Sequence, residues 1–346
     1  MTRIVDLRSD TVTLPPPGML GAIPRAPLGD DVYGEDPTVR KLEELAAEIT
    51  GKEAALLVAS GTMGNLVSIL AHCGRGDEVI LGDQCHTFLY EAGGISALGG
   101  VHPHPVRNEP DGTIPIEAIA AAIRPENIHF PRTRLICLEN THNRCWGSPL
   151  TPEYTREVAA LARANGLAVH LDGARIFNAA AALGVEVEEL VQGVDSVIFC
   201  LSKGLAAPVG SVICGERGFI EEARRIRKQV GGAMRQAGII AACGIYALEH
   251  MVERIPEDHE NAKLLAQGIA HIDGLYTEPE RVRTNILYFE LERGDPAEFQ
   301  ERCRKRGVLF NRTGPRQFRL VTHYGISRPD VDYALSVLAE AAQSFL

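Results

Sequence analysis

The feature that most constrains the fold is a regular alternation of short apolar runs and helical patterns between residues 54 and 214. Apolar runs with the length of buried strands lie at 54–58, 78–81, 101–106, 134–139, 167–171, 197–201 and 209–214. Segments with a helical pattern separate most of them, at 61–72, 88–97, 116–123, 152–165 and 176–183. Repeated β/α units of this kind predict an α/β fold, with a mostly parallel seven-stranded sheet covered by helices on both faces.

The two ends of the chain have different patterns from this central part. A polar N-terminal arm carries three consecutive prolines, and a helix over 38–50 follows it, with Gly51 as a C-cap. Two helices separated by Gly231 and Gly232 extend to about residue 254. Helices near 257–272, 296–306 and 329–345, with strands near 284–291 and 316–321, then predict a smaller α+β domain. We expect an arm over 1–18 that joins the small domain and the site, a large domain over 19–250 and a small domain over 251–346.

Composition excludes several classes of protein. The 346 residues are 45% hydrophobic and 23% charged, as in ordinary soluble proteins, and the net charge of −10 argues against nucleic-acid binding. The densest basic run, 224–228, falls in a helical pattern, so we expect a solvated or interface face there. No apolar run is long enough to span a membrane, and the N-terminus lacks the apolar core of a signal peptide.

Eight cysteines are scattered along the chain, and none forms a CxxC pair. Several lie within apolar strands, where a free cysteine behaves as a small hydrophobic residue. This usage predicts reduced thiols and a cytoplasmic protein. Nothing in the sequence specifies a set of metal ligands.

Polar residues gather where the predicted strands end. They are Ser60 to Thr62, Asp83 to His86, Glu139 to His142, Asp172 to Arg175, and Ser202 with Lys203. Ligands of parallel α/β sheets bind at the carboxyl ends of the strands. These segments therefore predict one binding site.

Lys203 is an unusual residue for a turn between two buried strands. It is either a solvated turn lysine or an amine kept for chemistry, since a desolvated lysine becomes nucleophilic toward an aldehyde. Asp172 is either a helix N-cap or the partner of a pyridine nitrogen. The turn at Ser60 offers a helix N-terminus to a phosphate but has neither the GxGxxG nor the GxxxxGK[ST] pattern, which disfavours a nicotinamide cofactor. Together these residues predict pyridoxal 5'-phosphate (PLP) bound by Lys203.

Seven motifs occur in an order that resembles the low-specificity L-threonine (L-allo-threonine) aldolases, which are PLP enzymes of the aspartate-aminotransferase fold (fold type I). The motifs are Asp6-Leu-Arg-Ser-Asp-Thr, Gly29-Asp-Asp-Val-Tyr-Gly-Glu-Asp-Pro, Ser60-Gly-Thr-Met-Gly-Asn, Glu139-Asn-Thr-His, His170-Leu-Asp-Gly-Ala-Arg, Leu201-Ser-Lys-Gly-Leu and Gly231-Gly-Ala-Met-Arg-Gln. The resemblance covers about residues 3 to 325. It implies reversible retro-aldol cleavage of β-hydroxy-α-amino acids to glycine and an aldehyde.

The resemblance also implies a role for each matching residue. Lys203 would form the Schiff base and Asp172 would pair with the pyridine nitrogen. The phosphate would be held by Gly61, Thr62 and Ser202, and the ring face covered by His86. The substrate carboxylate would be bound by Ser9, Arg175 and Arg319, with Arg175 also near the cofactor. Either His86 or His142, directly or through a water molecule, would take the hydroxyl proton.

Further matches imply subunit contacts near the site. Tyr33, Lys228 and Arg235 lie in motifs that face a neighbouring subunit in this family. The resemblance therefore implies a homotetramer built from two dimers. In a monomer these three would be ordinary surface residues.

Two alternatives remain open from the sequence. One is another fold-type-I PLP enzyme, such as an amino-acid β-lyase or an aminotransferase, which would release ammonia and a keto acid. The other is a binding or scaffold protein that kept the fold without catalysis. The sequence does not define the preference at Cβ or the size of the aldehyde.

Overall fold

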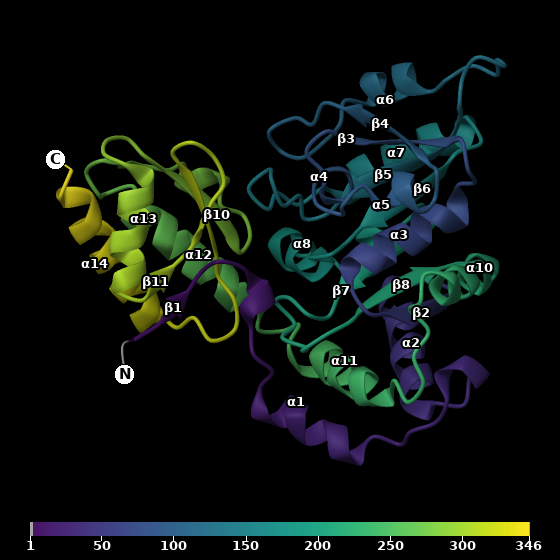
Figure 1. Cartoon of the computed structure of the whole chain (residues 1–346), viewed down its shortest axis with the longest axis horizontal. Coiled ribbons are helices and arrows are strands. Elements are labelled where there is room, and N and C mark those ends of the chain that lie inside the picture. Colours follow the sequence, from purple (N-terminus) through teal and green to yellow (C-terminus); the bar gives the residue numbers. More distant parts are fainter. Residues whose placement is uncertain (1–2, 346) are drawn as a thin grey trace.

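The computed structural model describes residues 3–345 and places the chain in two bodies that lie side by side (Figure 1). The large body is a seven-stranded sheet with the helices packed on it. The small body is a four-stranded sheet with the last three long helices. Each body has its own main hydrophobic cluster. We propose a boundary near residue 250, between helix α11 (Gly238–His250) and helix α12 (Ile255–Ile269).

The large sheet has the strand order β2-β8-β7-β6-β5-β3-β4. Its strands are β2 (Ala54–Val58), β3 (Asp77–Gly82), β4 (His102–Val106), β5 (Arg132–Glu139), β6 (Ala168–Asp172), β7 (Ser196–Cys200) and β8 (Ser211–Gly215). Only β8 is antiparallel to its neighbours, β2 and β7. The predicted mostly parallel, seven-stranded α/β sheet is confirmed, because buried runs of β-branched residues mark such strands clearly.

Helices cover both faces of this sheet. The longer ones are α2 (Pro37–Thr50), α3 (Gly61–His72), α6 (Ile116–Ala122), α7 (Pro152–Ala164), α8 (Ile176–Leu183), α10 (Arg217–Gln229) and α11 (Gly238–His250), and the shorter ones are α1 (Pro17–Ala22) and α9 (Val187–Leu190). As predicted, α2 ends at Gly51, which adopts a left-handed conformation with φ 61°.

The prediction of one helix over 88–97 is wrong. The structure has two short helices, α4 (His86–Leu89) and α5 (Gly94–Ala97). Between them Ala92 and Gly93 are both left-handed, with φ values of 54° and 65°, which no right-handed helix can continue through. The break lets the side chain of Glu91 turn inward to hydrogen-bond with His86 and Asn65.

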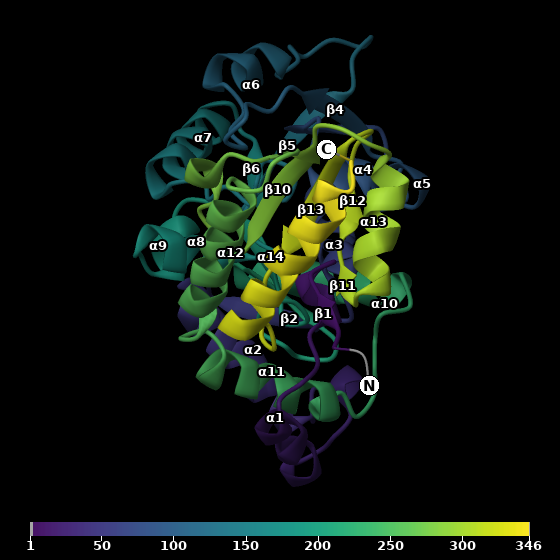
Figure 2. The same cartoon turned by 90° about the vertical axis from the view of Figure 1, so that its left-hand side faces the viewer.

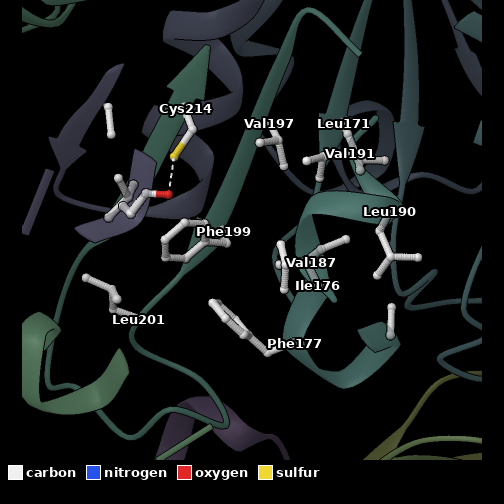
Figure 3. Packing of buried hydrophobic residues seen from close by; sticks show 14 of the residues in the cluster. Leu171, Ile176, Phe177, Val187, Leu190, Val191, Val197, Phe199, Leu201 and Cys214 are labelled. Atoms are coloured by element: carbon white, nitrogen blue, oxygen red, sulfur yellow. Dashed lines mark hydrogen bonds between the residues drawn. The ribbon is translucent and has the colours of Figure 1, made fainter. Parts of the chain in front are cut away.

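Apolar packing fixes the ends of β6 and β7 that carry the polar residues. Phe177 of α8 meets Phe199 of β7 edge to face, with ring centroids 5.3 Å apart (Figure 3). Leu171 and Ile176, on either side of the polar segment, are fully buried in the same cluster. Asp172 and Arg175 are therefore attached to a rigid base.

The small body is built on a central strand, β10 (Ile286–Leu291), which pairs antiparallel with β9 (Leu275–Tyr276) and β13 (Gln317–Val321). Strand β12 (Asn311–Arg312) extends the sheet beside β13. Helices α12 (Ile255–Ile269), α13 (Pro296–Lys305) and α14 (Arg328–Gln343) accompany this sheet (Figure 2). Its core contains four mutually packed phenylalanines: Phe289, Phe299, Phe310 and Phe318.

The N-terminal segment connects the two bodies. Strand β1 (Val5–Asp6) pairs in parallel with β11 (Val308–Leu309) of the small body (Figure 1). The chain then passes through a 3-10 turn (Asp10–Val12) and reaches α1, which packs on α11 of the large body.

The expectation that the basic run 224–228 forms a solvated or interface face is wrong for Arg227. Arg227 is 1% exposed and lies on the side of α10 that also buries Ile220 and Ala223. Its guanidinium donates to the carbonyl oxygen of Leu57 and to Asp31 Oδ2, at 2.6 Å each. The helical period explains this, since residue 227 follows 223 by one turn.

Within residues 3–345 no helix combines the length and the apolar character that crossing a membrane requires.

We predict that Arg227→Met lowers the free energy of unfolding by about 3–5 kcal/mol, because it leaves the buried Asp31 carboxylate without its closest cation. Arg225→Met is the matched control on the same helix, since the Arg225 side chain is 74% exposed. We expect the control to change stability by no more than about 0.5 kcal/mol. Urea denaturation of both variants checks this, and equal midpoints would contradict it.

Candidate active site

A cavity of about 210 Å³ lies at the carboxyl ends of the parallel strands. All five strand-end segments identified in the sequence contribute to it. Its lining comprises Thr11, Ser60, Gly61, Thr62, Asn65, His86, Glu91, Glu139, Asn143, Asp172, Ala174, Arg175, Cys200, Ser202 and Lys203. Titratable side chains that converge in one small cavity mark a candidate functional site.

A larger cavity, of about 720 Å³, lies elsewhere on the large body. Asp77, Arg132 and Leu167, which line it, stand at the start of β3, at the start of β5 and just before β6. This is the amino-terminal edge of the sheet, where ligands of such folds do not usually bind. We therefore take the smaller cavity as the candidate active site.

One end of the cavity is the N-terminus of α3. Ser60 caps this helix by accepting a hydrogen bond from the backbone N–H of Met63 at 3.1 Å. Gly61 and Thr62 are the first two helical residues, so their N–H groups point out of the helix end. A Cβ atom on Gly61 would lie 2.8 Å from Cys200 Sγ, so a side chain here would disturb the end of the helix. This end of the cavity suits an anion such as a phosphate.

Ser202 and Lys203 follow β7 and line the same cavity. Lys203 is half-buried in a turn, and its carbonyl oxygen accepts a hydrogen bond from Ala206 at 2.8 Å. Its amine is close enough to the buried Asp10 carboxylate to help lower the pKa of Asp10.

Asp172 terminates β6 and is 4% exposed. Its Oδ1 accepts a hydrogen bond from the N–H of Ala174 at 3.1 Å, and its Oδ2 accepts one from Asn65 Nδ2 at 2.8 Å. The carboxylate is therefore fixed from both sides. It can face a cationic or protonated ring nitrogen in the cavity.

His86 begins α4 and is held by two carboxylates. Its backbone N–H donates to Glu139 Oε2 at 2.6 Å, and its Nδ1 lies 2.9 Å from Glu91 Oε1. Burial alone would lower the pKa of His86, but the hydrogen bond to Glu91 and the nearby carboxylates raise it. Burial raises the pKa of the Glu91 carboxyl, and the hydrogen bond to His86 only partly offsets this.

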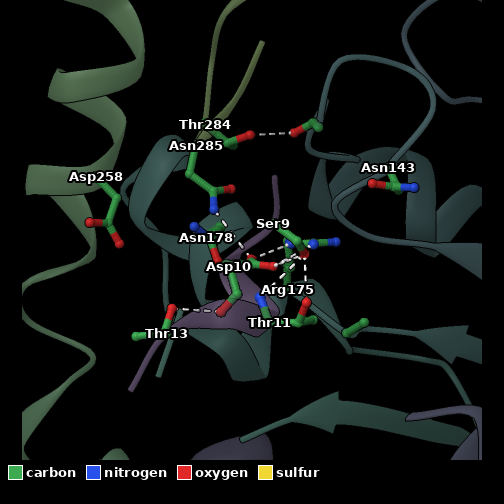
Figure 4. A network of polar contacts seen from close by, with 12 residues as sticks. Ser9, Asp10, Thr11, Thr13, Asn143, Arg175, Asn178, Asp258, Thr284 and Asn285 are labelled. Carbon is green, nitrogen blue, oxygen red and sulfur yellow. Dashed lines mark hydrogen bonds and ion pairs between the residues drawn. The ribbon is translucent and has the colours of Figure 1, made fainter. Parts of the chain in front are cut away.

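Arg175 and Asp10 form a buried ion pair at the floor of the site. Arg175 Nε and Nη2 donate to the two carboxylate oxygens of Asp10 at 2.6 and 2.7 Å (Figure 4). Asn285 Nδ2, from the small body, reaches the same carboxylate at 3.3 Å. Although burial opposes it, Arg175 holds the pKa of Asp10 well below its ordinary value. Arg175, which was predicted to bind the substrate carboxylate, therefore already binds the Asp10 carboxylate through the Nε and Nη2 edge of its guanidinium.

Ser9 lies next to this pair, at the N-cap of the 3-10 turn. Its Oγ accepts hydrogen bonds from Thr11, from the backbone N–H at 3.2 Å and from the hydroxyl at 2.9 Å. Thr11, rather than Ser9, lines the cavity within the described chain.

Arg319 approaches the site from β13 of the small body. Its Nη1 donates to Asn143 Oδ1 at 2.8 Å, and Asn143 lines the cavity. Its Nη2 donates to the carbonyl oxygen of Arg8 at 3.2 Å. Arg319 thus contacts both the arm and the rim of the site.

His142 is 1% exposed and, among the described residues, is not part of the cavity lining. Neither of its ring nitrogens has a hydrogen-bond partner within residues 3–345. It packs beside Gly112, where an added Cβ would lie 2.6 Å from the Cβ of His142.

Among the described residues, the three that were expected at a subunit contact do not line the cavity. Tyr33 is 75% exposed, and Lys228 is also exposed. Arg235 is paired with Asp30 at 3.0 Å through a guanidinium that is 56% exposed.

Sequence reasoning assigned no role to Asp10, Thr11, Asn65, Glu91 or Glu139. Four of them stand within the seven motifs: Asp10 and Thr11 shortly after Ser9, Asn65 at the end of the Ser60 motif, and Glu139 at its strand end. Their place within these motifs was the signal by which the sequence could have identified them. Glu91 gave no signal, because its inward position depends on the break between α4 and α5.

Side-chain ligand atoms of His86, Glu91 and Asp172 lie within 4.8 Å of one another. This spacing could suggest a metal. However, Asn65 Nδ2 donates to both Glu91 and Asp172, at 2.8 Å each, and so lies between the two carboxylates. The cluster is therefore explained by hydrogen bonds alone.

Comparisons with known proteins agree with this geometry. Residues 6–292 match the family described as beta-eliminating lyase. Low-specificity L-threonine aldolase 1 of Arabidopsis thaliana is 49% identical over 345 residues, covering 98% of this chain and 96% of the relative.

Two solved structures share the fold. Threonine aldolase of Leishmania major superposes with a TM-score of 0.83 at 20% identity, covering 97% of this chain and 98% of the other. Serine palmitoyltransferase (SPT), solved with PLP, superposes with a TM-score of 0.78 at 18% identity, covering 99% of this chain and 88% of the other.

We predict that Glu91→Gln lowers the pKa of His86, because the substitution removes the carboxylate that stabilises the protonated ring. The histidine signals of the cofactor-free protein, followed by NMR across a pH titration, measure this directly. Glu44→Gln, on the exposed face of α2, is the control and should leave the His86 titration unchanged. An unchanged midpoint in Glu91→Gln would refute this account of His86.

Proposed function

Because the chain belongs to the beta-eliminating lyase family and matches a low-specificity L-threonine aldolase over nearly its whole length, we propose that it cleaves L-threonine, L-allo-threonine and related β-hydroxy-α-amino acids to glycine and an aldehyde. The observation that carries the proposal is the meeting of Lys203, Asp172 and the N-terminus of α3 in one cavity. The family resemblance identified from the sequence motifs is confirmed.

Pyridoxal 5'-phosphate is the cofactor that fits this cavity. The helix N-terminus at Gly61 and Thr62, with Ser202, suits the phosphate. The fixed carboxylate of Asp172 suits the pyridine nitrogen, and Lys203 offers an amine for the aldehyde carbon. When bound, PLP withdraws electrons from the α-carbon of an attached amino acid. A structure of the same fold that carries PLP supports this choice.

Substrate recognition is assigned to the arginines and the arm. We propose that Arg319, Arg175 and Ser9 bind the substrate carboxylate and thereby orient the Cα–Cβ bond. Asp10 engages the Nε and Nη2 edge of Arg175, so Arg175 would offer its remaining Nη1 to the substrate. Arg319, which contacts Asn143 at the rim, would supply the second guanidinium.

The proton of the β-hydroxyl needs a base within reach. His86 is favoured over His142 because it lines the cavity. Glu91 at 2.9 Å from His86 Nδ1 would stabilise the imidazolium that forms when the ring takes the proton. His142 would act through a water molecule or by supporting the Asn143 segment.

We further propose that the protein is a homotetramer of two dimers. Apolar side chains are exposed along the α1 and α11 side of the large body, including Leu20, Leu28 and Ile239, with Tyr33 nearby. Burial of such residues favours association. Tyr33, Lys228 and Arg235 would then lie at a subunit contact. The free, buried state of all eight cysteines supports a cytoplasmic location.

We predict that the purified protein with PLP cleaves both L-threonine and L-allo-threonine. Each molecule cleaved should release one molecule of glycine and one of acetaldehyde. Lys203→Ala should abolish the visible absorption of bound PLP and lower kcat by at least about 100-fold. Lys41→Ala, at a lysine whose side chain is 61% exposed, should change neither.

Aldehyde assay and absorption spectra check both expectations. Ammonia and a keto acid without aldehyde would instead indicate a β-lyase or an aminotransferase. A protein that neither takes up PLP nor cleaves the substrate would indicate a binding role.

We predict that Gly61→Ala weakens PLP binding by roughly tenfold, about 1.4 kcal/mol. The new Cβ would lie 2.8 Å from Cys200 Sγ and move the helix end away from the phosphate. Titration of the cofactor-free protein with PLP measures the effect.

Two matched variants make this test specific. Gly218→Ala introduces a Cβ in α10 with no atom within 4 Å, so it should not alter PLP affinity. The double variant Gly61→Ala with Cys200→Ala should recover most of the lost affinity. Equal losses in the single and double variants would rule out the steric explanation.

A further inference from the structure

A chain of buried polar side chains runs from Asp172 away from the cavity. Asn65 Oδ1 lies 3.1 Å from His170 Nε2, and His170 Nδ1 lies 2.8 Å from Ser196 Oγ. Ser196 Oγ lies 2.8 Å from His72 Nε2. Asn65 is 1% exposed, and His170 and Ser196 are fully buried. Among residues 3–345, the three members beyond Asn65 do not line the cavity, so no substrate contact explains them.

Secondary structure brings these residues into line. Asn65 and His72 are two turns apart on the same face of α3. His170 precedes Asp172 by two residues on β6, so both side chains point to the same face of the sheet. Ser196 of β7 is the register partner of His170. One face of one helix thus lies against one face of two adjacent strands.

Hydrogen counting fixes the orientation of the Asn65 amide. Its Nδ2 is 2.8 Å from both Glu91 Oε1 and Asp172 Oδ2, and a carboxylate can only accept. Both N–H bonds of the amide are therefore used. Its Oδ1 must accept, so His170 Nε2 carries a hydrogen.

The same logic continues along the chain. Burial lowers the pKa of His170 to about 3, so the ring is neutral and its Nδ1 is an acceptor. The Ser196 hydroxyl then donates to His170 Nδ1. Its oxygen accepts from His72 Nε2–H, in a ring whose pKa burial lowers to about 4. Every hydrogen bond in the chain has one direction, toward the two carboxylates.

We propose that Asn65, His170, Ser196 and His72 form a positioning relay that sets the geometry of Asp172 toward the cofactor and of Glu91 toward His86. Asn65 is the member that joins the two carboxylates, which fix the orientation of its amide, and His170, supported by Ser196 and His72, holds the amide oxygen in place. This inference rests on the proposed binding of PLP at Asp172. The relay residues act through Asp172 and Glu91 and touch neither substrate nor cofactor.

Two buried serines give a matched test. Ser196→Ala removes the hydroxyl that donates to His170. Ser68→Ala is the control, because Ser68 is also fully buried, stands on α3, and its Oγ has no partner within the described residues. Nitrogen NMR of the cofactor-free proteins reports the histidine tautomers. Wild type, Ser68→Ala and Ser196→Ala should all show His170 with its hydrogen on Nε2 alone, because Asn65 Oδ1 still accepts that hydrogen. Asn65→Leu removes this acceptor and should show a mixture of tautomers.

Cofactor measurements then connect the relay to the site. Ser196→Ala should raise the dissociation constant of PLP and lower kcat roughly three- to tenfold, and shift the pH at which the visible band of bound PLP changes. Asn65→Leu, which removes both hydrogen bonds to the carboxylates, should have effects of about 10–100-fold. Ser68→Ala should match wild type. Thermal unfolding of each cofactor-free variant identifies any effect that comes from loss of folding.

The outcomes separate this inference from the proposed function. A hydrogen on Nδ1 of His170 in the wild type would overturn the direction of the relay. Normal PLP affinity, band and kcat in folded Ser196→Ala and Asn65→Leu would overturn its positioning role while leaving the proposed function intact. A wild-type protein that fails to take up PLP would overturn the proposed function, and the positioning role with it.

Discussion

A buried charge needs a partner, and at the carboxyl edge of the large sheet this requirement connects segments that are far apart in the chain. Asp10 from the N-terminal segment pairs with Arg175, which follows β6, and Asn285 of the small body reaches the same carboxylate. Asp172 depends on Asn65 of α3. Removing one partner would leave a charge in a low dielectric, so these contacts fix the arm, the helices and both bodies around one cavity.

The same contacts divide the surroundings of the cavity into two parts that come from different bodies. The part that suits the cofactor is built from α3, β6 and β7, whose bases are closely packed. The rim is closed from the small body, where Arg319 reaches Asn143 and the backbone of Arg8. A rigid cofactor platform with a rim from a second body suits an enzyme that keeps its cofactor and exchanges its substrate.

Much of the fold could be predicted from the sequence, and the errors have definite causes. The strands of the large sheet are correct to within two residues, because runs buried on both faces give a strong signal. The helix over 88–97 was wrong, since the inward turn of Glu91 outweighs local helical preference. Arg227 was assigned to a solvated or interface face because a basic run does not show which member faces the sheet.

By itself the sequence determined the α/β class, the strand ends that carry polar groups, and the group of residues around Lys203, because these follow from local periodicity and from the geometry of parallel strands. Tertiary structure alone decided the partners: Asp10 on Arg175, Glu91 on His86, and the relay behind Asp172. The reason is physical. Which buried donor meets which acceptor depends on helix rotation and strand register across segments distant in the chain, and local sequence preferences carry no information about either.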